Sequence, residues 1–184
     1  KRIIDVVFSI ISGIIFSPLI LISAILTKFS SRKGPVIFKH QRIGVNNKLF
    51  TLYKFGIMKE DKGSLWTAEN DDRFTAVGKI LSYTHLNEIP QLYNIFKGDI
   101  SFIGPRPESK ELVELYQQIP YYKIRHIIKP GLTGWAQVNY KASASVEEAQ
   151  EKLKYDIYYI KNRSLIIDFL ILLKTVKYLF KSLK

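Results

Sequence analysis

The most constraining feature of the sequence is an uncharged stretch close to its start. Val6 to Thr27 gives 22 consecutive residues without a charged side chain. As a straight α-helix this stretch would be about 33 Å long, which is enough to cross the hydrocarbon core of a bilayer. We therefore expect a membrane-associated chain.

The middle of this stretch carries a helix breaker, Ser17-Pro18. Proline lacks the backbone N–H of a continuous helix and bends or ends it. The residues on both sides of the stretch are basic, whereas a single span normally has its basic excess on one side. These basic residues are Lys1 and Arg2 before it and Lys28, Arg32, Lys33, Lys39 and Arg42 after it. We expect a re-entrant helix that turns at Ser17-Pro18 and leaves by the face it entered.

Two alternatives to a re-entrant helix are weighed. A kinked transmembrane anchor would have the same length and composition. A cleaved signal peptide is disfavoured, because no Ala-x-Ala-like site follows the long apolar run. The start of the chain at Lys1, without an initiator Met, is compatible with a trimmed N-terminal piece.

The C-terminal segment 164–184 has the pattern of a second membrane-associated helix. Its lysines share one helix face and its large apolar residues mark the opposing face. The lysines are Lys174, Lys177, Lys181 and Lys184, and the apolar residues are Phe169, Leu172, Leu173, Val176, Phe180 and Leu183. Such a basic amphipathic helix can lie among lipid head groups. Packing against the N-terminal helix is the alternative.

Composition narrows the class of protein. A length of 184 residues with 47% hydrophobic residues supports one structural unit with a core, and the net charge of +12 indicates an anionic partner. Cysteine is absent, and the three histidines lack zinc-site spacing. A nucleic-acid-binding module is disfavoured by the long uncharged stretch, and a structural membrane-surface protein is a third possibility.

The fold class predicted from these patterns is α+β and mostly helical. Residues 1–30 would form the re-entrant membrane helix, and residues 31–163 the central part, which includes a small hairpin within residues 34–58. Residues 164–184 would form the basic interfacial helix of the same structural unit. Anionic membrane lipids are therefore expected partners.

A candidate site lies in residues 84–107. Asn87 and Glu88 precede Pro90 and an apolar pattern of helical spacing, so we expect Asn87 near the helix N-cap. A helix N-terminus beside a carboxylate suits phosphate and a cation. Gly98 should end that helix, and the following Gly-Pro-Arg-Pro turn would support Arg106 for substrate binding. Arg106 could equally brace the fold through backbone carbonyls, and the whole stretch could be an ordinary capped helix and turn.

Four further residues are candidates for substrate or phosphate binding. Lys54 lies in the predicted hairpin, Asp71 and Arg73 lie in a polar loop, and Gln137 lies in a loop rich in glycine. Side chains of these types bind phosphates and nucleotides, but solvated surface positions would look the same.

Several motifs in a fixed order resemble the bacterial sugar transferases known as monotopic phosphoglycosyl transferases. They are Lys1-Arg2 with Asp5, the helix broken at Ser17-Pro18, Gly34-Pro35-Val36, Gln41-Arg42-Ile43-Gly44, Tyr53-Lys54-Phe55, Leu86 to Leu92, Gly98-Asp99, Gly104 to Pro107 and Gly131 to Asn139. The resemblance implies transfer of a phospho-sugar from a UDP-sugar to undecaprenyl phosphate, with release of UMP, as the first membrane step of surface glycan assembly. It also implies Mg²⁺ as cofactor and a location on the cytoplasmic face of the bacterial inner membrane, with residues 31–163 as a cytoplasmic catalytic-type domain. No nucleic-acid partner is expected, because of the long uncharged stretch, and a homodimer is left open.

The chain departs from this family at three positions. The family has Asp-Glu where this chain has Asn87-Glu88; the aspartate attacks the β-phosphate and the glutamate helps to hold Mg²⁺. Gly56 and Ser82 stand where the family commonly has arginine. Three hypotheses follow: engineered substitutions in an otherwise active enzyme, a natural member that keeps binding but has lost catalysis, or use of Glu88 as the nucleophile.

Overall fold

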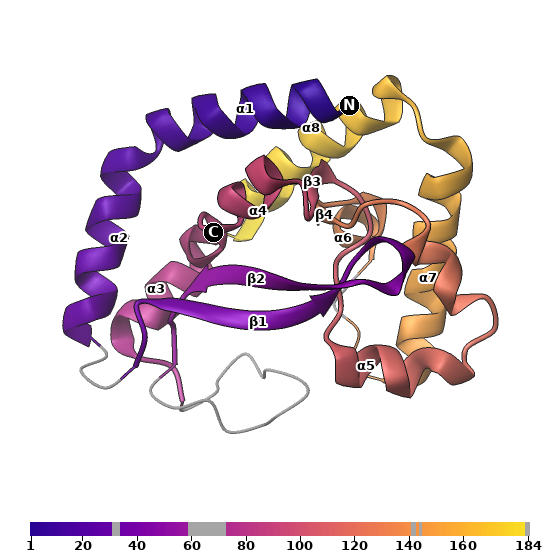
Figure 1. Cartoon of the computed structure of the whole chain (residues 1–184), viewed down its shortest axis with the longest axis horizontal. Helices are drawn as coiled ribbons and strands as arrows, with labels where there is room; N and C mark the ends of the chain where they lie inside the picture. Colours follow the sequence, from indigo (N-terminus) through magenta and orange to yellow (C-terminus); the bar gives the residue numbers. More distant parts are fainter. Residues whose placement is uncertain (31–33, 59–72, 141–142, 144, 183–184) are drawn as a thin grey trace. The chain divides into compact units, whose positions relative to one another are not determined.

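The computed structural model describes residues 1–30, 34–58, 73–140, 143 and 145–182 (Figure 1). Helices predominate over two short sheets, which confirms the expected α+β class. Contacts divide the chain into two compact units: residues 1–40 with 52–97, and residues 41–51 with 98–182. The predicted division at residues 30 and 163 stays a prediction.

The first unit begins with two helices that meet at a sharp bend. α1 (Arg2–Ile15) and α2 (Ser17–Ser30) are inclined by 65° to each other (Figure 1). Pro18 has no N–H to offer the Ile14 carbonyl, and the Ser17 hydroxyl donates to that carbonyl instead, at 2.8 Å. The break predicted at Ser17-Pro18 is confirmed. Among the described residues no single helix has the length and apolarity to cross a membrane, whereas the bent pair together does.

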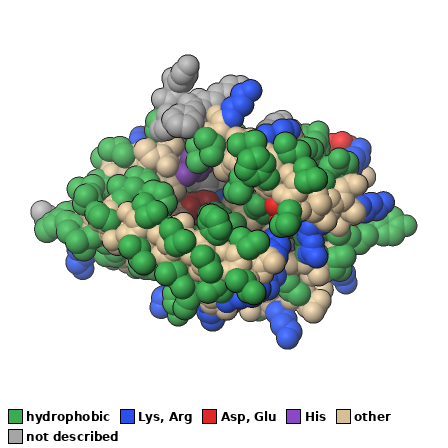
Figure 2. Space-filling model, turned by 90° about the horizontal axis from the view of Figure 1, so that it is seen from above, with side chains coloured by type: hydrophobic (Ala, Val, Ile, Leu, Met, Phe, Trp, Pro, Cys, Tyr) green, Lys and Arg blue, Asp and Glu red, His purple; other side chains and the backbone are tan. Residues whose placement is uncertain are grey.

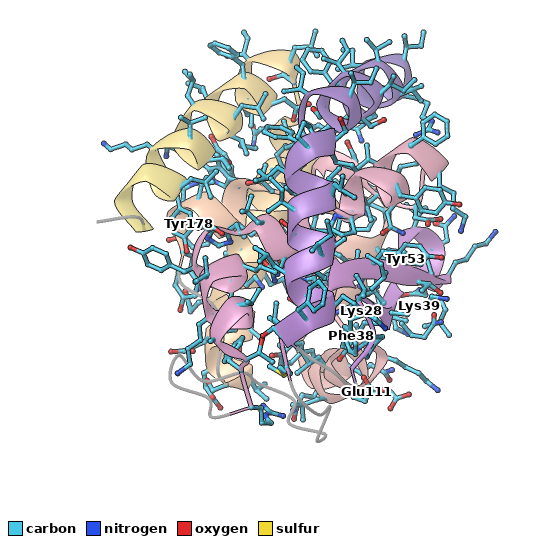
Figure 3. All side chains as sticks on the ribbon, turned by 90° about the vertical axis from the view of Figure 1, so that its left-hand side faces the viewer. Lys28, Phe38, Lys39, Tyr53, Glu111 and Tyr178 are labelled. Atoms are coloured by element: carbon cyan, nitrogen blue, oxygen red, sulfur yellow. The ribbon has the colours of Figure 1, made fainter. Side chains whose placement is uncertain are left out.

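The α1–α2 pair turns its polar side chains inward and its apolar side chains outward. Buried polar residues of the pair, each at most 4% exposed, are Asp5, Ser9, Ser23 and Thr27. Strongly exposed apolar residues include Ile3, Ile14, Leu21 and Phe29, which are 62–80% exposed. Figure 3 looks onto α2, and Figure 2 shows hydrophobic side chains gathered on the face where α1 lies. A helix that faces water has the reverse arrangement, so this surface is suited to an apolar environment.

A basic side chain of α1 fixes this helix to α4 (Gln91–Lys97). The Arg2 guanidinium donates to the carbonyls of Ile95 and Phe96, at 2.7 and 2.5 Å. These carbonyls belong to the last turn of α4, where helical carbonyls lack partners and the dipole favours a cation. α1 accordingly packs along α4 (Figure 1). Gly98, with φ of 97°, follows α4 as predicted.

The remaining elements of the first unit are short. They are α3 (Ala76–Tyr83), the 3₁₀ turn η2 (Leu86–Glu88) and the outer parts of a hairpin made of β1 (Ile37–Ile43) and β2 (Leu49–Phe55). The hairpin predicted within residues 34–58 is confirmed. Its turn, η1 (Val45–Asn47), has positive φ at Asn46 and Asn47, a conformation that asparagine tolerates better than most residues.

The second unit surrounds a short parallel sheet. β3 (Ser101–Ile103) pairs with β4 (Gly131–Thr133), in the register Ser101 to Gly131 and Ile103 to Thr133. The helical elements of this unit are α5 (Lys110–Leu115), η3 (Tyr116–Gln118), η4 (Tyr122–His126), α6 (Trp135–Asn139), α7 (Val146–Asn162) and α8 (Leu165–Ser182).

The predicted C-terminal helix exists as α8, and one of its exposed lysines contacts an aromatic ring. Ile171 of α8 is fully buried with Ile103 and Tyr159. Phe169 and Val176, which belong to the predicted apolar face, are exposed. Lys174 lies over the Trp135 ring at 4.6 Å and donates to Asn139. The predicted shared face of the lysines stays a prediction, and the Trp135 ring gives Lys174 a local partner.

We predict that Gly78→Ala destabilises the protein by about 2 kcal/mol, because a Cβ on this helical glycine would lie 2.0 Å from the Ile57 carbonyl oxygen. The measurement is thermal unfolding in detergent micelles followed by circular dichroism. Gly13→Ala is the matched control, since a Cβ there meets nothing within 4 Å and alanine favours helix. Equal midpoints for the two variants would contradict the prediction.

Candidate active site

An ion pair in the first unit brings two of the predicted site residues together. Lys54 on β2 and Glu88 in η2 lie with Nζ and Oε1 2.7 Å apart, and their side chains are 18% and 15% exposed. The position of Lys54 is set by α4, because the Asn94 side-chain oxygen accepts from the neighbouring Tyr53 N–H at 3.0 Å. An interaction between mostly buried charges is stronger than one at the surface, so this pair is held in place.

Asn87, the residue before Glu88, is buried, and its side-chain oxygen has no partner among the described residues. Its side chain is 7% exposed, and within the described part of the chain Oδ1 accepts no hydrogen bond. The amide nitrogen of Gln91, one turn later, is also buried and unpartnered in that part of the chain. A buried polar atom without a partner costs about 1–3 kcal/mol of stability. Such an atom is commonly retained because it has a functional role.

The expected N-cap role of Asn87 is wrong. Asn87 lies inside η2, and α4 begins only at Gln91. The reason is a left-handed residue upstream: His85 has φ of 57°, and its carbonyl accepts from the Glu88 N–H. The chain therefore makes a separate 3₁₀ turn before α4, and the Asn87 oxygen caps no N–H of α4 among the described residues.

Gly56 stands in a position that has no room for a side chain. A Cβ there would lie 2.3 Å from the Pro35 carbonyl oxygen, and the Gly56 N–H donates to the Val36 carbonyl at 3.0 Å. An arginine at this position would require the backbone of residues 35–36 to shift. The departure at Gly56 is thus built into the local structure, whereas Ser82 on α3 is partly exposed.

The other predicted site residues are distributed over both units and over residues outside the described structure. Asp71 lies outside the described residues, and Arg73 is a half-buried residue of the first unit. Arg106 and Gln137 belong to the second unit. The Gln137 amide nitrogen donates to the Leu132 carbonyl at 2.9 Å, and its oxygen is buried without a partner among the described residues.

A buried arginine that the sequence patterns did not single out organises the second unit. Arg125 is 4% exposed, and its guanidinium contacts Asp156 at 3.0 Å and Glu108 at 3.6 Å. It also donates to the Tyr122 hydroxyl and, at 2.8 Å, to the Arg106 carbonyl. The available signal was an aspartate on the apolar face of a helix, because Asp156 is buried together with Leu153 and Ala149 of α7.

Two guanidinium groups hold the turn that carries Arg106. Arg125 donates to the Arg106 carbonyl, and Arg42 donates to the Pro107 carbonyl at 3.3 Å. The Arg106 residue is thus braced through a backbone carbonyl, but the bracing guanidinium belongs to Arg125. This leaves the backbone of the turn fixed by partners on both β1 and η4.

The charges of this cluster shift several pKa values. Burial acts to raise the pKa of Glu108, but Lys152 and Arg125 outweigh it and lower the pKa to about 2. Burial acts to lower the pKa of Arg125. The nearby Tyr122, Asp156 and Glu108 outweigh it, so the pKa of Arg125 is raised above its usual value. Burial and the nearby Arg125 lower the pKa of His126 to about 4. His126 is therefore neutral at pH 7, with Nδ1 2.6 Å from the Asn47 side-chain oxygen.

The described residues offer an incomplete set of metal ligands. No group of three or more His, Cys, Asp or Glu residues suited to a metal is present among them. Mg²⁺ does not need such a set, since it is commonly held by one or two protein oxygens together with substrate phosphates and water. The Glu88 carboxylate and the unpartnered Asn87 oxygen meet this smaller requirement in type.

Comparison with known proteins decides the family. A family model described as bacterial sugar transferase matches residues 1–182. The chain belongs to this family. It is 42% identical over 181 residues to a UDP-N-acetylgalactosamine-undecaprenyl-phosphate N-acetylgalactosaminephosphotransferase from Aeromonas hydrophila. The aligned residues make up 96% of this chain and 43% of that protein. The resemblance seen in the sequence motifs is confirmed.

Two further relatives extend the comparison. A UDP-glucose:undecaprenyl-phosphate glucose-1-phosphate transferase from Klebsiella pneumoniae is 37% identical, over 96% of this chain and 39% of that protein. An exopolysaccharide production protein PSS from Rhizobium leguminosarum bv. phaseoli is 36% identical, over 96% of this chain and 92% of that protein. This sugar transferase chain thus spans about two fifths of the Aeromonas and Klebsiella proteins.

We predict that Glu108 makes stability depend on pH in acid. Because its folded pKa is about 2 and its ordinary value is 4.5, its contribution of about 3 kcal/mol is fully present above about pH 4.5 and is lost as the pH falls toward 2. The measurement is the free energy of unfolding by urea between pH 2.5 and 7.

Glu108→Gln should remove this component and lower stability at pH 7 by about 3 kcal/mol, since Arg125 loses a buried partner. Glu151→Gln is the matched control, because Glu151 pairs with Lys154 at an exposed site and should change stability by less than about 0.5 kcal/mol. An unchanged acid dependence in Glu108→Gln would refute the assignment.

Proposed function

We propose that this sugar transferase moves a phospho-sugar from a UDP-sugar to undecaprenyl phosphate and releases UMP. The relatives named above support the substrates, since two of their names specify a UDP-sugar and undecaprenyl phosphate. The structural observation that carries the proposal is the Lys54–Glu88 pair, together with the buried oxygen of the preceding residue Asn87, which has no partner among the described residues. It places a cation, a carboxylate and a further oxygen ligand in one unit.

Each residue of this group has a task that fits its chemistry. Lys54 supplies a positive charge for the diphosphate of the sugar nucleotide, and its pairing with Glu88 holds it in place before substrate binds. Glu88 and the Asn87 oxygen would hold Mg²⁺, which when bound offsets the negative charge of the phosphates. Arg106, on its braced turn, is a further phosphate-binding residue of the proposal.

The reaction is limited at position 87. In the transfer that the family resemblance implies, a carboxylate oxygen at this position bonds to the β-phosphorus as the bond between the two phosphates breaks and UMP leaves. The phosphate of the acceptor lipid then displaces the carboxylate. An amide oxygen is neutral and a far weaker nucleophile, so Asn87 can bind but is poorly suited to attack.

A second candidate function is a chain that keeps binding but has lost transfer. The observation that favours it is the combination of Asn87 with the crowded backbone at Gly56, which leaves no space for the arginine of the family motif. The two candidates differ in whether a carboxylate at position 87 is sufficient for turnover. Glu88 is the remaining carboxylate beside it and would have to act as nucleophile if the unaltered chain is active.

We infer that the α1–α2 pair enters the bacterial inner membrane from the cytoplasmic face and returns to that face. The outward apolar surface of α1 and α2, their bend of 65° and the buried polar residues of the pair support a re-entrant, monotopic arrangement. Lipid contact would remove these exposed side chains from water, which stabilises the inserted state by about 25 cal/mol for each Å² of apolar surface.

We predict that Asn87→Asp raises UMP release by at least about 100-fold, because it provides an anionic oxygen nucleophile. The measurement is UMP release from a panel of UDP-sugars with undecaprenyl phosphate and Mg²⁺. Glu88→Gln in the Asn87→Asp background should abolish the gain. Asn162→Asp makes the same charge change at an exposed helix end and should leave the rate unchanged.

Two results would count against these proposals. Silence from Asn87→Asp with folded, membrane-bound protein would favour the binding-only candidate. Turnover by the unaltered chain that persists in Glu88→Gln would refute the assigned role of Glu88.

A further inference from the structure

The turn that carries Arg106 belongs to no helix or strand. Residues 104–108 connect β3 to the start of α5 in the second unit. Pro105 and Pro107 are buried, and Arg106 between them is half-buried. Proline fixes its own φ and restricts the residue before it to extended conformations, so Pro107 also limits the backbone of Arg106. The local sequence therefore stiffens the backbone on both sides of one cationic side chain.

Four consecutive carbonyls of this turn, at residues 105–108, each accept a hydrogen bond from a residue distant in the sequence. The first accepts from the Gly131 N–H at 2.9 Å, and the last accepts from the Ile43 N–H at 3.0 Å. The two between them accept from the guanidinium groups of Arg125 and Arg42, at 2.8 and 3.3 Å. Most buried carbonyls find their partners within regular helices and sheets. This turn obtains them from three separate segments, so its backbone is fixed before a ligand binds.

The Glu108 carboxylate, at the end of the turn, contacts both guanidinium groups. Its Oε1 lies 3.6 Å from Arg125 Nη1 and 2.9 Å from Lys152 Nζ, and its Oε2 lies 4.0 Å from Arg42 Nη1. Asp156 contacts Arg125 as well, at 3.0 Å. With Arg106 included, these residues carry four cations and two carboxylates. Their excess of positive charge is suited to an anionic ligand.

We propose that Arg42 and Arg125 are positioning residues for the binding of a diphosphate by Arg106. The inference rests on the proposed function, from which the diphosphate ligand is taken. The two arginines act through the backbone of the turn, because each donates to one of its carbonyls. A guanidinium on a fixed backbone loses less conformational entropy when it binds phosphate than the same group on a loose loop. Arg42 and Arg125 therefore strengthen diphosphate binding without touching the ligand.

Arg42 is the better of the two residues to change. Its side chain is 18% exposed, compared with 3% for Arg125, so its replacement disturbs the core less. Arg42→Met keeps an unbranched apolar stem and removes the donor to the Pro107 carbonyl, whereas Arg42→Lys retains a cationic donor. Arg163→Met is the matched control, because Arg163 is an exposed arginine of the same unit at the end of α7.

The test is equilibrium binding of UDP to the detergent-purified chain in the presence of Mg²⁺. Arg106→Ala should weaken binding at least about tenfold, because charge-assisted hydrogen bonds to phosphate are lost. Arg42→Met should weaken it about fivefold, a coupling of the size found between contacting residues. Arg42→Lys should recover most of that loss, and Arg163→Met should bind UDP as the unaltered chain does. Arg42→Met combined with Arg106→Ala should bind no more weakly than Arg106→Ala alone, because Arg42 acts through Arg106.

The outcomes separate this inference from the proposed function. Additive losses in the double variant would overturn it, because Arg42 would then act on the ligand or on the fold independently of Arg106. Undiminished UDP binding by Arg42→Met or by Arg106→Ala would overturn it as well. The expected coupling, in a protein whose Asn87→Asp variant releases no UMP, would refute the proposed transfer and leave the positioning roles standing.

Discussion

The first unit depends on the burial of a few polar side chains of α1 and α2. Asp5, Ser9, Ser23 and Thr27 are withdrawn from the surface, and the apolar side chains between them are left outside. Such an arrangement is costly in water and favourable in lipid, because apolar surface gains free energy when it leaves water and polar groups lose it when they enter hydrocarbon. The Arg2 guanidinium of α1 donates to two carbonyls in the last turn of α4, and these hydrogen bonds attach the α1–α2 pair to the helix that follows Glu88.

The candidate active site uses the same principle on a smaller scale. Lys54 and Glu88 are held together at 2.7 Å in a largely buried setting, and Asn87 keeps one oxygen unpartnered among the described residues. Charges and polar atoms in such surroundings act more strongly on a bound phosphate than the same groups in water would. In the second unit the guanidinium groups of Arg125 and Arg42 fix the backbone. They donate to two consecutive carbonyls of the turn that carries Arg106.

Local patterns in the sequence predicted the parts of the fold that local forces decide. The break at Ser17-Pro18 follows from a missing N–H, the hairpin turn from asparagines with positive φ, and the end of α4 from Gly98. Among the candidate site residues, the sequence proposed Lys54 and Glu88 without showing that they pair. It placed Asn87 at a helix cap, which is wrong because the left-handed His85 starts a separate turn. The prediction for Asp71 lies outside the described residues.

What the sequence by itself determined is the apolar helix pair, its bend and membership of the bacterial sugar transferase family, because these depend on composition, proline chemistry and the order of short motifs. Only the tertiary structure decided that Arg125 is buried with Glu108 and Asp156, that Lys174 lies on Trp135, and that Gly56 has no room for a side chain. Each of these is a contact between residues distant in the chain, or a close approach of two backbone segments. A linear pattern carries no information on which distant group will meet a given charge or glycine.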